Sequence, residues 1–99
     1  MKIPNKIKVN GIIYKIEYVE EINDNIHSAD YRGIALIKDK KVKILNSYCE
    51  DDKRRTIIHE AIHILDDDFK INLSENSVRR LTSGLYAFLK DNKLLKEGD

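Results

Sequence analysis

A long amphipathic helix is the feature that most limits how this chain can fold. From Thr56 to Phe69, apolar side chains return at the 3.6-residue period of an α-helix and form one stripe suited to a core. The members of that stripe are Ile57, Ile58, Ala61, Ile62 and Leu65. Upstream, Ser47-Tyr48-Cys49-Glu50 matches the S-x-x-E capping box, which predicts a helix start near Tyr48. A cap at Asp51 or Asp52 would start the helix one turn later.

The middle of this helix carries the sequence His59-Glu60-Ala61-Ile62-His63, an H-E-x-x-H motif. Residues four apart lie on one face of a helix, so both imidazoles can point a nitrogen at one Zn²⁺ about 2.0–2.1 Å away. Glu60 lies beside that point, where a carboxylate can take a proton from water and pass it on. The spacing therefore predicts a hydrolytic zinc site with His59 and His63 as ligands and Glu60 as general base. Such ligands would also hold Co²⁺, Ni²⁺ or Mn²⁺.

A catalytic zinc has three protein ligands and one open position, so one more side chain is needed. Glu75 is the first choice, because it begins a second predicted helix and a short connection can fold it back against the metal. Asp66 shares the histidine face, but three ligands spread over seven helical residues would span about 10.5 Å. A supporting role, in which Asp66 accepts the other ring N–H of a ligating histidine, suits it better. His27, in a polar loop, is a further possible ligand.

Two β-hairpins are predicted before the helix. Their strands are Lys6–Val9, Ile12–Tyr18, Gly33–Lys38 and Lys41–Leu45. Asn10-Gly11 joins the first pair and is the strongest short hairpin signal, and Asp39-Lys40 joins the second. Candidates for the inner face of the second hairpin are Leu36, Val42 and Ile44. Residues 19–32, between the hairpins, are polar and aperiodic and predict a loop.

A second helix is predicted after the motif, with Ser74 as its N-cap. Its apolar stripe is Val78, Leu81, Leu85, Phe88 and Leu89. Residues 93–99 are expected to be a frayed tail. Together these elements predict an α+β fold in which a small antiparallel sheet of two hairpins packs on the H-E-x-x-H helix and a C-terminal helix. Residues 1–99 are expected to form a single domain.

The composition of the chain excludes several classes of function. With 99 residues, the chain has room for one small core and one site. The formal net charge is +1 and basic residues alternate with acidic ones, so neither a nucleic-acid nor a membrane-surface partner is predicted. No apolar run is long enough for a signal peptide or a membrane span, which predicts a cytoplasmic protein. Cys49 is the single cysteine, so any metal must be held by histidines and carboxylates.

The stretch from Thr56 to Asn92 resembles the small phage and prophage zinc-peptidase-like proteins and, more distantly, the compact zincins of the ImmA/IrrE and SprT types. Many families share H-E-x-x-H, and its combination with Leu73-Ser74-Glu75 and Gly84-Leu85-Tyr86 makes the resemblance specific. The resemblance implies a minimal zincin fold with Glu60 as general base. The zinc ligands that it implies are His59, His63 and Glu75.

Two departures from that pattern concern supporting residues. In larger zincins with a Glu ligand, an acid that supports a histidine follows four residues after that Glu; here the position is Arg79, and Asp66 could substitute. No extra histidine is evident to stabilise an oxyanion, which leaves Tyr86 as the best candidate and Arg79 as another. Tyr86 can also be a tyrosine at the edge of the core. A polar line on the second predicted helix could face the site and comprises Glu75, Arg79, Thr82 and Tyr86.

These residues support two hypotheses from different classes. In the first, the protein is a zinc-dependent metallopeptidase that hydrolyses a peptide or protein substrate, which binds along the edge of the second hairpin near residues 41–46. In the second, it is a catalytically silent zinc-binding interaction or regulatory module of phage or prophage origin. An α+β domain without metal is a third possibility. Replacement of Glu60 by Gln separates the first two, because only hydrolysis needs the general base.

Overall fold

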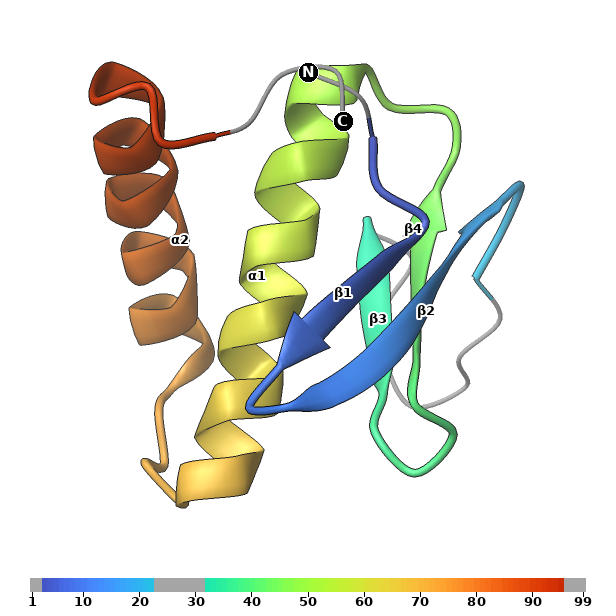
Figure 1. The fold of residues 1–99 in the computed structure, drawn as a ribbon, viewed down its shortest axis with the longest axis horizontal. Helices are drawn as coiled ribbons and strands as arrows, with labels where there is room; N and C mark the ends of the chain where they lie inside the picture. The colour runs from blue at the N-terminus through green and yellow to red at the C-terminus, as the bar shows by residue number, and fades with distance from the viewer. Residues whose placement is uncertain (1–2, 23–31, 96–99) are drawn as a thin grey trace.

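The computed structural model describes residues 3–22 and 32–95 of the chain (Figure 1). In order, the elements are β1 (Lys6–Val9), β2 (Ile12–Val19), β3 (Gly33–Leu36), β4 (Lys41–Leu45), α1 (Glu50–Phe69) and α2 (Glu75–Asp91). Four strands and two helices occur where the sequence predicts them, so the α+β class is confirmed. His27 and most of the predicted loop between the hairpins lie outside the described residues, as does the tail from residue 96 onward.

The four strands form one mixed sheet with the order β1-β2-β4-β3. Each hairpin is antiparallel, as predicted, but β2 pairs with β4 in parallel, with Ile16 opposite Val42. The prediction of an antiparallel sheet is therefore wrong, because the pairing between the hairpins is a long-range contact that no turn residue specifies. β4 lies between two strands and β3 is the outer strand, so the expected peptide-binding edge near residues 41–46 is wrong as well.

The first hairpin turns at Asn10 and Gly11, whose φ angles are 51° and 82°. Two successive residues with positive φ are what a tight two-residue hairpin turn requires, and Asn-Gly meets that requirement at little steric cost. The local signal in the sequence therefore specified this turn correctly.

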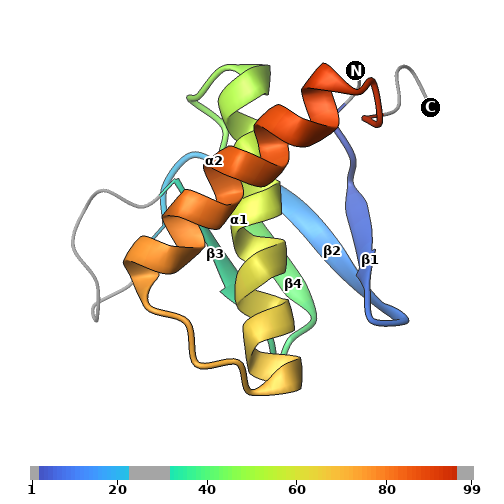
Figure 2. The ribbon, with the colours of Figure 1, turned by 90° about the vertical axis from the view of Figure 1, so that its left-hand side faces the viewer.

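The core lies between the sheet and α1, and α2 packs on the other side of α1 (Figures 1 and 2). Its fully buried large side chains are Tyr14, Val42, Ile44 and Ile64, and Val78 of α2 is fully buried on the other side of α1. The predicted stripe of α1 is partly wrong: Ile64 is fully buried, whereas Leu65 is 36% exposed. The capping box is not formed either, because α1 begins at Glu50 after Cys49, whose side chain makes no capping hydrogen bond.

α2 is rotated relative to the prediction. Ser74 caps it as expected, with its hydroxyl oxygen accepting the N–H of Ser77 at 3.1 Å. Its buried residues, however, are Val78, Thr82 and Tyr86. Three members of the predicted stripe point outward: Leu81, Leu85 and Phe88 are 44%, 41% and 56% exposed. The predicted polar line therefore supplies much of the face toward α1. Neither of the helices described here has the length and apolarity needed to cross a membrane.

Candidate metal centre

The structure brings the three predicted ligands together at one point. His59 Nε2 lies 3.2 Å from His63 Nε2 and 3.0 Å from Glu75 Oε1, and His63 Nε2 lies 3.2 Å from Glu75 Oε2. Donors bound tetrahedrally to zinc at about 2.05 Å are separated by roughly 3.3 Å. The observed spacing is close to that value. The three side chains therefore lie close enough together to hold one metal ion, and among the described residues they are the one group of at least three possible ligands.

The segment between the helices positions Glu75. Lys70 has a left-handed φ of 53° and its N–H donates to the carbonyl of Asp66, which ends α1. The Asp66 carboxylate then accepts the N–H of Leu73 at 3.1 Å. Asp66 thus holds the connecting backbone just before Glu75. The predicted roles of Asp66, as an alternative ligand or a support for a histidine, are not what its contacts show.

Thr82 takes the supporting role at His59. Its hydroxyl donates to the carbonyl of Val78 at 2.7 Å, and its oxygen lies 3.4 Å from His59 Nδ1. Because the single hydroxyl proton is donated to Val78, the Thr82 oxygen can only accept a hydrogen bond from His59. This favours a proton on Nδ1 of His59. The lone pair of Nε2 then faces His63 and Glu75. Burial, the largest cause, lowers the pKa of His59 and favours the neutral imidazole that metal binding requires. The sequence placed Thr82 on the polar line without assigning it this contact.

Glu60 is buried between α1 and β3, with 6% of its surface exposed. Burial raises its pKa to about 8, the charge of Glu75 adds to this effect, and a hydrogen bond with the backbone of Ala35 opposes it. A carboxyl group with a pKa near neutrality can both take up and release a proton under physiological conditions. A buried acid that lines a pocket and has a pKa raised by burial and a neighbouring charge is also a frequent sign of a functional site.

Gly33 allows β3 to approach α1 closely enough for this arrangement. A Cβ atom built on Gly33 would lie 2.7 Å from Thr56 Cγ2 and 3.0 Å from both Ile44 Cδ1 and the Lys43 carbonyl oxygen. Any larger residue would push the strand from the helix, and with it the backbone that contacts Glu60. The sequence prediction missed this residue, although a glycine inside a strand can indicate a close backbone approach.

Tyr86 is not brought to the ligand group. Its hydroxyl donates to the carboxylate of Asp51 in the first turn of α1, and its ring is 3% exposed. Burial is the main reason that its pKa is raised. We therefore assign Tyr86 a packing role, which corrects its prediction as the oxyanion-stabilising residue.

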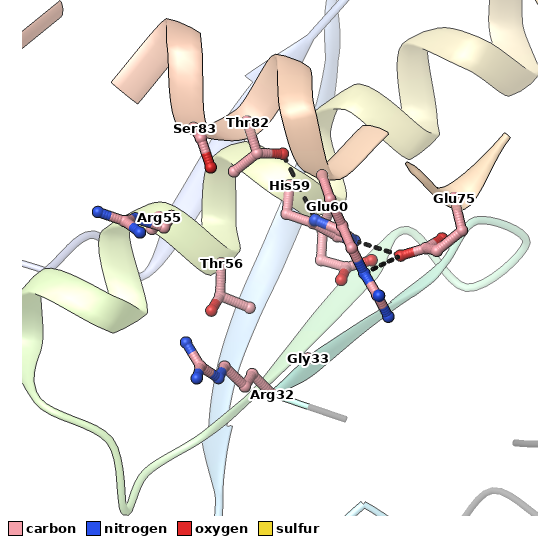
Figure 3. A pocket seen from close by; sticks show the side chains of 10 residues that line it. Arg32, Gly33, Arg55, Thr56, His59, Glu60, Glu75, Thr82 and Ser83 are labelled. Atoms are coloured by element: carbon pink, nitrogen blue, oxygen red, sulfur yellow. Dashed lines mark hydrogen bonds and ion pairs between the residues drawn. The ribbon is translucent and has the colours of Figure 1, made fainter. Parts of the chain in front are cut away.

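His59, Glu60 and Glu75 line one pocket of about 360 Å³ (Figure 3). Its lining residues are Arg32, Gly33, Arg55, Thr56, His59, Glu60, Glu75, Arg79, Thr82 and Ser83. Arg79 Nε lies 3.6 Å from Glu75 Oε1, so the residue that departs from the pattern of the larger zincins forms an exposed ion pair with the predicted ligand. The sequence prediction missed Arg32 and Arg55, which are distant in sequence from Glu75 and share only this pocket with it.

Comparisons of the chain with models of protein families, with curated proteins and with solved structures find no match. The resemblance to small zincin-like proteins therefore stays a prediction. The residues of the pocket are themselves the basis for assigning a function.

Proposed function

We propose that the protein is a zinc-dependent peptidase of minimal zincin type. The observation that carries the proposal is the cluster of His59, His63 and Glu75. The two Nε2 atoms lie 3.2 Å apart, and each lies 3.0–3.2 Å from a different carboxylate oxygen of Glu75. The buried carboxyl group of Glu60 lines one pocket with His59 and Glu75. Three possible zinc ligands and a nearby carboxyl group that can act as general base are the two parts that metal-assisted hydrolysis needs.

In this mechanism each residue has a distinct task. Bound through His59, His63 and Glu75, a Zn²⁺ ion would supply Lewis acidity, polarising a carbonyl group and lowering the pKa of water. Glu60 accepts the proton of the attacking water and returns it to the departing amine. Its pKa of about 8 in the metal-free protein falls when a cation is bound nearby, so the carboxylate form is then present at neutral pH.

Among the described residues, no strand pairs with the outer edge of β3, and this edge is where a peptide would bind. The carbonyl of Arg32 accepts the N–H of Leu45 at 2.8 Å, so this pair is hydrogen-bonded across β3 and β4. Because antiparallel strands alternate, the backbone groups of Gly33 and Ala35 then face away from β4. An extended peptide added at that edge would run past Glu60. This placement replaces the edge near residues 41–46.

The experiment that tests the function compares the purified protein with Glu60→Gln. The wild type should bind one zinc per chain in native mass spectrometry and cleave members of a quenched fluorescent peptide library. Glu60→Gln should retain zinc and lose at least about 100-fold in kcat/KM, the usual effect of removing a general base. His63→Ala is the control that should lose both zinc and cleavage. Undiminished cleavage by Glu60→Gln would show that Glu60 is not the general base and would contradict this mechanism.

A catalytically silent zinc-binding module is the second candidate. The observation that favours it is the exposed apolar row of α2, formed by Leu81, Leu85 and Phe88, which a protein partner could cover. Under this alternative the wild type binds zinc but cleaves no peptide, and Glu60→Gln changes no measured property. The same pair of proteins therefore decides between the two functions.

A further inference from the structure

The pocket has two chemically different sides (Figure 3). His59, Glu60 and Glu75 lie together on one side, where the hydrolytic groups gather. Arg32 and Arg55 lie on the other side, on segments far apart in the sequence. Because the chain as a whole has a formal net charge of only +1, this pair is a local concentration of positive charge.

The charge of Arg55 is available to a ligand. Its side chain is exposed, and its guanidinium carbon lies 5.2 Å from the centre of the Tyr86 ring, which orients it. Among the described residues, no carboxylate lies within ion-pair distance of Arg55. The nearby Asp51 already accepts the Tyr86 hydroxyl, with Lys90 at 3.7 Å and Arg54 at 3.9 Å.

Arg32 is also held in place without being buried. Its guanidinium lies 4.8 Å from the centre of the Tyr48 ring, and its side chain is 51% exposed. Asp52 lies 3.7 Å away and neutralises part of its charge, as expected for a weak, exposed ion pair. Arg79 differs, because it is paired with Glu75 and thus belongs to the ligand group.

We propose that Arg32 and Arg55 bind a carboxylate of the substrate, which makes the protein selective for acidic peptides. Guanidinium groups offer several N–H donors in a plane and bind carboxylates more specifically than a single ammonium can. Ser83, which lines the same side, adds a hydroxyl group. The carboxylate comes either from an Asp or Glu side chain near the scissile bond or from the free C-terminus of the peptide. This inference rests on the proposed peptidase function.

Binding to zinc-loaded Glu60→Gln tests the inference without turnover. The probes are four fluorescein-labelled pentapeptides of one sequence, with Glu or Gln at the central position and a free or amidated C-terminus, measured by anisotropy. An acid should lower Kd by about tenfold or more, and Arg32→Gln or Arg55→Gln should each remove most of that preference. Arg80→Gln is the matched control, because Arg80 is exposed on α2 outside this pocket.

The four probes identify the source of the carboxylate. A Glu preference that persists in amidated peptides assigns the site to a side chain, whereas a preference for the free terminus in Gln peptides assigns it to the C-terminus. Equal binding of all four peptides, or a preference that survives both arginine substitutions, overturns the inference. Cleavage by the wild type is measured separately. Equal kcat/KM for acidic and neutral peptides would overturn the acidic selectivity but not the peptidase function. Selective binding without any cleavage would contradict the peptidase function but not the carboxylate site.

Discussion

Glu60 shows how one residue can oppose stability and serve chemistry. It is the one buried carboxyl group among residues 3–22 and 32–95, and its pKa of about 8 records the free-energy cost of charging it there. An apolar side chain at this position would pack against the sheet at no such cost. The metal site that we propose beside it would supply a physical reason for the acid, since a bound cation favours its charged form.

Thr82 is the residue whose substitution should change the metal site with the least change in packing. Thr82→Val keeps the shape of the side chain but removes the oxygen that faces His59 Nδ1 at 3.4 Å. Zinc affinity should fall by about tenfold, the lower end of the usual effect of removing such a partner, as measured by competition with a chromogenic chelator. Thr82→Ser keeps the hydroxyl and should restore most of the affinity. Equal zinc affinity in the Val and Ser variants would show that Thr82 does not orient His59.

At the scale of elements, the site depends on the close packing of α1 against β3 and on the connection between the helices. Gly33 permits the first, and the carboxylate of Asp66 holds the second by accepting the N–H of Leu73. In the first contact a strand backbone approaches the Thr56 side chain of α1, and in the second a side chain binds a backbone N–H. They explain how two short, ordinary elements place Glu60 and Glu75 within the same pocket.

Gly33→Ala tests the first of these contacts. The added methyl group would meet Thr56 Cγ2 at 2.7 Å and backbone at 3.0 Å, so the free energy of unfolding should fall by about 1–3 kcal/mol. Gly84→Ala is the control, because nothing lies within 4 Å of the added atom and Ala is the better helix former; it should raise stability by about 0.5–1 kcal/mol. Urea denaturation measures both. A neutral Gly33→Ala would mean that β3 does not need this close approach.

At the scale of the whole molecule, the proposed metal centre joins α1 and α2. Within the described residues α2 packs on α1 and not on the sheet, and its outer row remains exposed. Two of the proposed zinc ligands lie on α1, and the third is the first residue of α2. A bound ion would therefore act as a cross-link between the helices as well as a catalytic group.

Zinc should accordingly stabilise the folded chain. At free zinc concentrations a thousand times the Kd, linkage predicts a gain of about 4 kcal/mol in the free energy of unfolding, and for a chain of this size a rise in Tm of more than about 10 °C. Thermal unfolding followed by circular dichroism, with zinc and then with EDTA, measures the shift. His63→Ala should show no zinc-dependent shift. A shift of the same size in that variant would place the stabilising ion elsewhere.

Much of the local structure could be predicted because its causes are local. Asn10-Gly11 turns the first hairpin because these residues tolerate positive φ, and Ser74 caps α2 because its hydroxyl reaches the N–H of Ser77. The helical spacing of His59 and His63 likewise puts both imidazoles on one face, whatever else the chain does. For these features, neighbours within four residues supply the decisive interactions.

Only the tertiary structure decided the parallel pairing of β2 with β4, the rotation of α2 and the partners of its polar residues. Pattern in the sequence favoured Leu81, Leu85 and Phe88 as the buried face of α2, yet packing on α1 buries Thr82 and Tyr86 instead. Such outcomes depend on contacts between segments far apart in the chain, whose free energies no local period encodes. The sequence by itself thus determined which groups could do chemistry, and long-range packing decided which of them meet.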